Sequence, residues 1–263
     1  MIIRLEGVSV RRSGRTILGP LDWIVSAGER WVVLGANGSG KSTLLSVVDM
    51  ALWPTTGRVE ILGERYGRID VREHRRRIGL AGSAVEASFR DDLPPTDLIM
   101  TARHAATEPW WHDYSDDDRR YAHDLAIRFG LGHVMDHPFA SLSAGERRRT
   151  SIARALMPDP ELLLLDEPTA SLDLGARETL LRDLTTLAGA ADPTAIVLVT
   201  HHVEEIPAGF DHALVLRQGA IVASGALDDV LTDATLSEAY GLAIKVERRD
   251  GRATARLRPG ADA

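Results

Sequence analysis

The sequence predicts an α/β protein with a mainly parallel core sheet, an N-terminal antiparallel β subdomain and an inserted helical subdomain. Three observations predict this class. Short apolar runs alternate with turns over residues 2–34, strand and helix patterns alternate after residue 150, and a charged helical pattern fills residues 84–140 between them. Alternating strands and helices are typical of a parallel sheet with helices on both faces.

The first 80 residues contain the predicted antiparallel strands and the first helices. Turn sequences RRSGR and SAGER separate the apolar runs, and the continuous WVVL at 31–34 indicates a buried strand. A glycine-rich stretch and a helix follow, and Pro54 and Gly57 end that helix. RVEILG at 58–63 predicts a further strand. Residues 70–80 predict a short helix followed by another strand.

In the helical region, Ser115 followed by Asp118 predicts a capping box at a helix start. Beyond it we expect helices over 145–157 and 173–188, strands over 161–165 and 195–199, and hairpins over 213–225 and 245–257, the latter about an Asp-Gly turn. We therefore expect one domain over 1–263, with residues 1–83 and 150–243 as core, about 84–149 as helical subdomain, and 244–263 as C-terminal hairpin and tail.

Composition excludes several classes of protein. The chain has no cysteine, which excludes disulfides, thiolate metal sites and a cysteine nucleophile. Its longest stretch without Asp, Glu, Lys or Arg, 193–203, is too short to span a membrane, and the N-terminus does not resemble a secretory signal, so we expect a cytoplasmic protein. A net charge of -7 argues against general nucleic-acid binding.

Residues 35–42, GANGSGKS, match the phosphate-loop pattern G-x-x-x-x-G-K-[ST] between a predicted buried strand and a helix. Glycines let backbone N–H groups converge on phosphate oxygens, and the helix dipole adds positive potential. We expect a nucleoside triphosphate here, with Lys41 at the outer phosphates and Ser42 at Mg²⁺; the alternative is an ordinary glycine-rich turn. The predicted nucleotide-binding residues are Gly35, Ala36, Asn37, Gly38, Ser39, Gly40, Lys41, Ser42 and Thr43.

The sequence LLLLDEPT places Asp166 and Glu167 at the carboxyl end of a predicted buried strand, where open parallel sheets bind ligands. Taken alone, these residues are more typical of an ordinary helix start. Together with the phosphate loop, they suggest that Asp166 holds Mg²⁺ through water and that Glu167 orients the attacking water.

The stretches GANGSGKST, LSAGE, LLLLDEPTASLD and LVTHH, in this order, resemble an ATP-binding cassette (ABC) ATPase over nearly the whole chain. The chain is also similar to single-domain bacterial ABC ATPases that are labelled as molybdenum-transport ATPases. The resemblance implies the P-loop NTPase fold of ABC ATPases, with ATP and Mg²⁺ as cofactors.

The same resemblance implies that two copies, or one copy and a similar ABC subunit, dimerise head to tail around two ATP molecules. The signature residues Ser143, Ala144, Gly145 and Glu146 would complete the partner's site, although Gly145 alone is also compatible with an ordinary helix start. Ser171 and Asp173 match the loop that communicates across the dimer (the D-loop). The implied partner is a separate membrane permease, which would place the chain at the inner face of the plasma membrane.

By the same resemblance, His201 matches the switch histidine that contacts the γ-phosphate. His202 beside it raises the alternative of a metal pair. Neighbouring side chains at a strand end point in different directions, so we expect no such pair.

Three positions depart from the family pattern. Ser83 stands where most transporter subunits have a glutamine, and the one glutamine, Gln218, falls in a predicted hairpin turn. Glu146 replaces the last glutamine of the signature. Arg12 or Arg11 stands where the family stacks an aromatic residue on adenine, a position that a planar guanidinium can also fill.

Two further features have ordinary interpretations. The triplet 147–149, Arg-Arg-Arg, predicts a solvated helix face, with nucleic-acid contact as the alternative. Trp110 and Trp111 predict local packing, with docking of a membrane partner as the alternative.

We therefore expect an ATP-hydrolysing subunit that drives a separate permease. The alternative is a soluble ABC ATPase that acts as an ATP-driven switch on a protein or nucleic-acid complex, which Ser83 favours.

Overall fold

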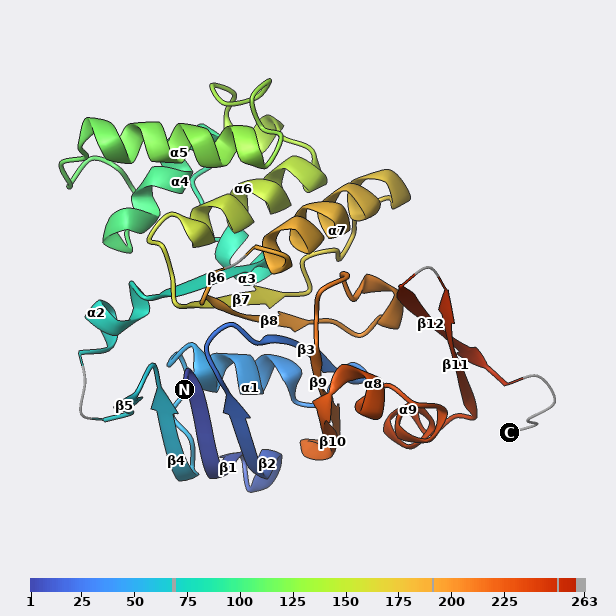
Figure 1. Ribbon diagram of the computed structural model, residues 1–263. Coiled ribbons are helices and arrows are strands. Elements are labelled where there is room, and N and C mark those ends of the chain that lie inside the picture. Colours follow the sequence, from blue (N-terminus) through green and yellow to red (C-terminus); the bar gives the residue numbers. More distant parts are fainter. Residues whose placement is uncertain (68–69, 191, 250, 259–263) are drawn as a thin grey trace. The chain divides into compact units, whose positions relative to one another are not determined.

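The computed structural model describes residues 1–67, 70–190, 192–249 and 251–258, which fall into two compact units (Figure 1). The first unit combines residues 1–69 with 184–263, and the second spans residues 70–183. Asp250 of the predicted C-terminal turn and the tail residues 259–263 lie outside the described residues.

The N-terminal sheet of the first unit has the strand order β2-β1-β4-β5 and is antiparallel, as predicted. Apolar residues alternate along β1 and are buried, because one face of the sheet covers the core. The strands are β1 (Ile3–Arg12), β2 (Arg15–Val25), β4 (Thr56–Ile61) and β5 (Glu64–Arg65).

A second sheet of the first unit is centred on β3 (Arg30–Leu34). It pairs in parallel with β8 (Ala195–Val199) and β9 (His212–Arg217), while β10 (Ala220–Ala226) is antiparallel to β9. Every residue of β3 and β8 is buried, as in parallel strands that are covered on both faces. The sheet positions α1 (Lys41–Val48), which follows β3 after a short loop.

The C-terminal elements belong to the first unit. Gln218 and Gly219 form the turn of the β9–β10 hairpin, and β11 (Ile244–Arg249) pairs with β12 (Arg252–Leu257), so both predicted hairpins are confirmed. The shorter elements near them are η3 (Val203–Glu205), α8 (Leu227–Val230) and α9 (Asp233–Tyr240).

In the second unit, β6 (Ile78–Gly82) and β7 (Leu162–Asp166) pair in parallel. Helices α4, α5 and α6 pack against one another, as Figure 1 shows in green to yellow, and α6 also packs on β6. The helical elements are α2 (Val71–Arg75), α3 (Ser83–Glu86), α4 (Pro95–Thr101), η1 (Ala102–His104), α5 (Asp116–Arg128), η2 (Phe139–Ser141), α6 (Ala144–Leu156) and α7 (Leu174–Ala188), which runs on into the first unit.

Local signals explain where several of these helices begin. At α5 the predicted capping box forms, because Ser115 Oγ accepts from the Asp118 N–H while the Asp118 carboxylate accepts from the Ser115 N–H. The parallel pairings of β3 and β6, the antiparallel N-terminal sheet and the packed helices confirm the predicted fold class. Among the helices in the described ranges, none is long and apolar enough to cross a membrane.

Candidate functional site

The phosphate loop, residues 35–42, connects β3 to α1 in the first unit. Its first residue, Gly35, has φ +154°, and a Cβ there would lie 2.4 Å from the Leu216 carbonyl oxygen. Gly40, just before the helix, has φ +105° in the left-handed region. These positions therefore require glycine, because a side chain would clash or strain the backbone.

The loop is fixed from outside by the turn of the β9–β10 hairpin. The Gly219 N–H donates to the Ser39 carbonyl at 2.9 Å, and the Gly219 carbonyl accepts from the Gly19 N–H at 2.7 Å. Sequence reasoning missed this contact. The Gln-Gly turn was visible in the sequence, but nothing local indicated that it lies against residues 180 positions earlier.

Lys41, the first residue of α1, is only 5% exposed, and its Nζ donates to the carbonyl oxygens of Gly35 at 2.7 Å and Ala36 at 3.2 Å. Gly40 has no side chain with which to cap α1. The exposed Ser42 and half-buried Thr43 follow in the first helical turn. A cation beside an uncapped helix N-terminus is suited to binding phosphate.

His201 lies just beyond β8, where its carbonyl oxygen accepts a hydrogen bond from Tyr240 Oη at 3.0 Å. Neighbouring Thr200 donates its hydroxyl to Glu205, and its oxygen accepts from the His202 N–H at 3.1 Å. These bonds fix the backbone around the predicted switch histidine.

The expectation that His201 and His202 point in different directions is wrong. Their ring centroids lie 4.0 Å apart with the planes tilted by 42°. The strand ends at Val199, so the strict alternation of a strand no longer applies to these residues. In the parts of the chain that the structure describes, no group of three or more His, Cys, Asp or Glu residues is arranged to hold a metal ion.

Arg11 and Arg12 are both exposed at the end of β1. The Arg11 guanidinium donates to the Gly14 carbonyl oxygen at 3.3 Å, and the Arg11 N–H donates to Thr55. Arg11 is therefore engaged in its own turn, which favours Arg12 for contact with a base.

In the second unit, Asp166 ends β7 in register with Gly82 of β6. A Cβ on Gly82 would lie 2.9 Å from the Asp166 Cβ, so glycine allows the two chains to approach here. The next residue, Ser83, is exposed and begins α3. Ser83, which replaces the glutamine of the family pattern, is thus the residue next to Gly82, whose backbone faces Asp166.

The backbone after Asp166 is strained at two candidate residues. Glu167 has φ +45° and Ser171 has φ +64°, values that are uncommon for residues with side chains. Such conformations cost about 1–3 kcal/mol each and cluster at functional sites. The strain is therefore consistent with roles for Glu167 and the D-loop, although the residue pattern gave no sign of it.

The signature residues form the N-terminus of α6. Ser143 is the N-cap and makes a full capping box, with its N–H and its hydroxyl donating to the Glu146 carboxylate at 2.8 and 2.7 Å. His133 Nε2 lies 2.9 Å from the other carboxylate oxygen. Burial opposes ionisation of Glu146, but the hydrogen bonds from Ser143 and the proximity of His133 hold its pKa below the usual value.

The starts of α6 and α7 lie close together. A Cβ on Gly145 would lie 3.2 Å from the Ala176 Cβ in the first turn of α7. Asp173 Oδ1 accepts from the Ala176 N–H at 2.8 Å, which fixes the end of the D-loop. The structure therefore brings the signature and the D-loop together, with Ser143 and Ala144 exposed.

Two ordinary interpretations are wrong in part. Arg148 is 6% exposed and forms an ion pair with Glu86 of α3 at 3.0 Å, so the arginine triplet is not wholly a solvated face. Trp111 is 81% exposed rather than packed, while Trp110 lies under the guanidinium of Arg90 at 4.6 Å.

The family model for the ABC transporter family matches residues 18–170. The ABC transporter ATP-binding protein YlmA of Bacillus subtilis is 38% identical over 247 residues, covering 94% of this chain and 93% of the relative. The structure of cbiO1 from Clostridium perfringens, described as part of the ABC transporter complex cbiONQ, is similar with a TM-score of 0.76, 25% identity and coverage of 90% of this chain and 93% of that one. A dimeric bacterial ABC transporter cassette is similar with a TM-score of 0.74 and 25% identity, covering 86% of this chain and 99% of that one. From these matches, the chain belongs to the ABC transporter family, as one of its ATP-binding and ATP-hydrolysing subunits.

Proposed function

We propose that the chain binds Mg-ATP at residues 35–43, hydrolyses it in a head-to-tail dimer, and thereby drives a separate membrane permease. The observation that carries the proposal is the pair of helix N-termini at α1 and α6. The N-terminus of α1 follows Gly40 and has no side-chain cap, whereas that of α6 presents the exposed Ser143. The phosphate loop and the signature each occur once in the sequence. Two copies would therefore make two complete sites.

In each site, Lys41 and the N–H groups of the loop hold the phosphates. Glu167 orients a water for in-line attack on the γ-phosphorus, and His201 contacts the γ-phosphate. The bond to the bridging oxygen of ADP breaks as the bond to water forms. The positive φ of Glu167 is compatible with this role, because backbone strain of this kind clusters at functional sites.

Magnesium fits the oxygen donors that we assign to it. Ser42 offers a hydroxyl and Asp166 a carboxylate, while Mg²⁺ takes few protein ligands and keeps water and phosphate oxygens as the rest. When bound, the ion supplies charge neutralisation at the phosphates. In this assignment Ser42 would bind it directly and Asp166 would bind it through water.

The dimer is proposed from the signature. Ser143 and Ala144 are exposed at the start of α6, and a helix N-terminus favours a γ-phosphate brought by a second copy or a similar ABC subunit. Gly145 is buried and allows α6 and α7 to start close together beside Ala176, and on this proposal Ser171 and Asp173 communicate across the interface. The dimeric state of a cassette with the same fold supports this arrangement.

We also propose a separate permease and a position at the inner face of the plasma membrane, and the relatives support this. The cbiO1 structure is described as part of a transporter complex. The exposed Trp111 of the second unit offers an apolar contact of the kind found in interfaces. On this proposal the helical subdomain, about 84–149, provides the docking surface.

A soluble ATP-driven switch is the second candidate, and Ser83 favours it. Serine is shorter than the usual glutamine, so at this position it reaches a metal only through water, which weakens coupling to a membrane partner. Co-purification of the tagged chain from membranes separates the two candidates. A polytopic protein in the complex supports transport, and a soluble complex supports the switch.

The Glu167→Gln variant tests the reaction and the dimer together. We expect it to bind ATP, to hydrolyse it very slowly and to accumulate as a dimer in light scattering. Ser143→Arg in the same background is the matched control, since it blocks the signature and leaves the phosphate loop intact. A monomer at saturating ATP for Glu167→Gln alone would contradict the proposal.

A further inference from the structure

The C-terminal part of the first unit contacts the loop that carries His201. This part comprises α9 and the β11–β12 hairpin, residues 233–257, and lies beyond the residues 18–170 that match the family model. The contacts with the loop are hydrogen bonds made at two places, and a third set of contacts joins the hairpin to α9. Their arrangement indicates what the C-terminal part does.

The first contact comes from Tyr240, the last residue of α9. Its hydroxyl donates to the carbonyl oxygen of His201 at 3.0 Å. Burial raises the pKa of Tyr240 to about 12, and the charge of Glu204 acts in the same direction. The hydroxyl therefore stays protonated, and can donate, throughout the ordinary pH range.

The second contact is made by β12 with Glu204, three residues after His201. Arg252 Nη2 donates to the Glu204 carbonyl oxygen at 2.6 Å. The Ala255 N–H donates to Glu204 Oε1 at 3.2 Å. The main chain and the side chain of Glu204 are thus both held by one strand of the hairpin.

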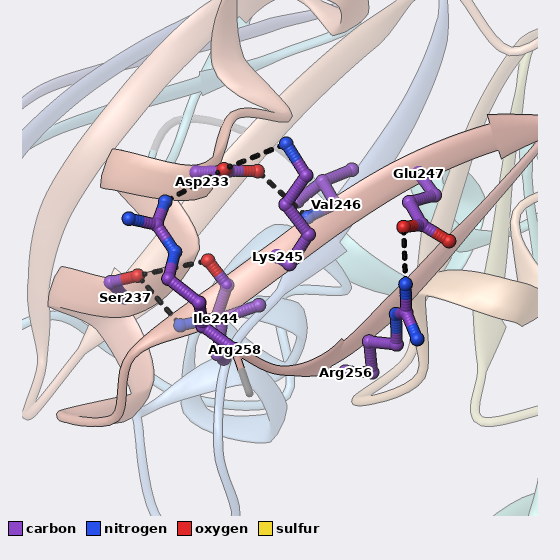
Figure 2. A network of polar contacts seen from close by, with 8 residues as sticks. All are labelled: Asp233, Ser237, Ile244, Lys245, Val246, Glu247, Arg256 and Arg258. Carbon is purple, nitrogen blue, oxygen red and sulfur yellow. Dashed lines mark hydrogen bonds and ion pairs between the residues drawn. The ribbon is translucent and has the colours of Figure 1, made fainter. Parts of the chain in front are cut away.

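The third set of contacts ties the hairpin to α9. Asp233, at the start of that helix, accepts from the Val246 N–H at 2.7 Å and forms ion pairs with Lys245 at 3.4 Å and Arg258 at 3.0 Å (Figure 2). Ser237 Oγ accepts from the Ile244 N–H at 2.9 Å. One helix therefore binds the hairpin near its start and the His201 backbone at its end.

Packing holds part of the His201 loop against these elements, because η3 packs on β12 and Val203 is buried. An open pocket lies there, lined among others by His201, Tyr240, Leu242 and Arg256. The hydrogen bonds from Tyr240, Arg252 and Ala255 hold the loop across that pocket, in addition to the bonds of Thr200 with Glu205 and His202. Their loss would let residues 201–204 shift without exposing a large apolar core.

We propose that α9 and the C-terminal hairpin form a brace that positions His201 for hydrolysis and takes no part in ATP binding. The brace rests on the proposed role of His201 at the γ-phosphate. Tyr240 in the brace and Glu204 in the loop that it holds are the positioning residues, and on this proposal neither touches the nucleotide. A misplaced His201 slows the chemical step and leaves the phosphate loop unchanged, so kcat falls while the KM for ATP stays constant.

Tyr240→Phe removes the hydroxyl and keeps the ring. We expect kcat to fall about three- to tenfold, as the loss of one positioning hydrogen bond predicts, with KM for ATP within about twofold of the parent. Tyr66→Phe is the matched control, because Tyr66 also donates its hydroxyl to a backbone carbonyl, that of Met50, at 2.8 Å. A fall in kcat of the same size in Tyr66→Phe would contradict the brace.

Glu204→Ala removes the acceptor of the Ala255 N–H, and we expect the same selective loss of kcat. Glu204→Gln keeps an oxygen that can accept this bond, so it should recover most of the rate. Equal losses in both variants would show that charge rather than position matters and would overturn the proposal. So would a loss that appears in KM rather than kcat.

His201→Ala separates failure of the brace from failure of the proposed function. If His201→Ala hydrolyses ATP at the parent rate, the proposed role of His201 fails. If His201→Ala is inactive while Tyr240→Phe and Glu204→Ala keep full kcat, only the brace fails. If the brace is correct, adding Tyr240→Phe to His201→Ala changes the residual rate no further.

Discussion

The helices α1 and α6 both begin at a candidate phosphate-binding motif, yet their N-termini are built in opposite ways. At α1 the N-cap is Gly40, which lies in the left-handed region and has no side chain, and Lys41 is buried beside the loop. At α6 the N-cap is Ser143, whose hydroxyl and N–H are bound by Glu146. Glycine therefore sets the backbone at the start of α1, whereas a side-chain cap binds the N–H groups at the start of α6.

This difference suggests a division of labour between the two ends. At a helix start without a side-chain cap, the first N–H groups have no competing side-chain acceptor and are available to hydrogen-bond the phosphates of a nucleotide. A capped start is stable without a ligand, and its serine can exchange one carboxylate for a phosphate when a partner arrives. The predictions below test this contrast, from the largest expected effect to the smallest.

Lys41→Ala should have the largest effect, because α1 starts with this buried cation whereas α6 starts with the uncharged Ala144. Charge-assisted hydrogen bonds of about 1.5–3 kcal/mol predict a loss of ATP affinity of roughly tenfold to a hundredfold or more, with no detectable turnover. Equilibrium binding of a fluorescent ATP analogue measures it. Lys245→Ala, the other lysine of the chain, is the control, and unchanged affinity in Lys41→Ala would remove the contrast.

Gly40→Ala and Gly145→Ala compare the two helix starts directly. An alanine at Gly40 has to adopt φ +105° with Leu18 Cδ1 only 3.1 Å from its Cβ, which should cost about 1–3 kcal/mol of unfolding free energy. Gly145 is inside α6, where alanine stabilises the helix by up to about 1 kcal/mol through its helix propensity. This gain is opposed by the tight 3.2 Å contact between the new Cβ and the Ala176 Cβ. Thermal unfolding should therefore show a lower Tm for Gly40→Ala alone. Equal losses would show that the two starts are built alike.

Ser143→Ala removes the cap of α6, and Ser115→Ala removes the equivalent cap of α5 in the same unit. Each should cost about 1 kcal/mol of stability. We expect ATPase activity to fall, by about tenfold or more, in Ser143→Ala only, because only that serine would face a partner's phosphate. Steady-state ATPase assays at saturating ATP measure the difference, and parallel losses in both variants would assign Ser143 a structural role only.

Glu146→Gln should have the smallest effect on stability at neutral pH, because glutamine can still complete the capping box. The lowered pKa of Glu146 means that its ionised form stabilises the fold above its ordinary pKa of 4.5 and that this contribution is lost as the pH falls through the folded-state pKa. Glu146→Gln should therefore lose less stability in acid than the parent does. Urea unfolding at pH 7 and pH 4 tests this.

Removal of the Glu146 charge should also tighten ATP-dependent dimerisation by a few fold, since a carboxylate beside Ser143 repels the incoming γ-phosphate. Asp118→Asn in the α5 capping box is the control, because its pKa is also lowered, chiefly by the hydrogen bond from Ser115. The control should reproduce the change in acid stability and leave dimerisation unchanged. Sedimentation in ATP distinguishes the two effects.

Features that depend on neighbours in the sequence were predictable. The Ser115 capping box, both hairpins and the buried strands β3, β7 and β8 follow from residue patterns over a few positions. The phosphate loop followed from its glycine spacing and its place between a strand and a helix. Its anchoring by Gly219 did not, because that contact joins residues far apart in the chain.

Two errors had a local signal that was overlooked. Gly145, Arg148 and Ile152 are buried and recur at helical spacing along α6, so one arginine of the triplet had to face inward. The strand alternation applied to His201 and His202 fails because both lie beyond the end of β8. The exposure of Trp111, by contrast, had no local signal in the sequence, because a pair of adjacent tryptophans fits both local packing and docking.

The hydrogen bonds of Gly219 to Ser39 and Gly19 have a further consequence for nucleotide capture. A loop that is hydrogen-bonded to a neighbouring turn loses little conformational entropy when it binds a ligand. More of the energy of its contacts with the ligand therefore contributes to the binding free energy. Association should then be fast and single-exponential, as for a preformed receptor. Weakening the hydrogen bonds of Gly219 should lower the association rate constant for ATP more than it raises the dissociation rate constant.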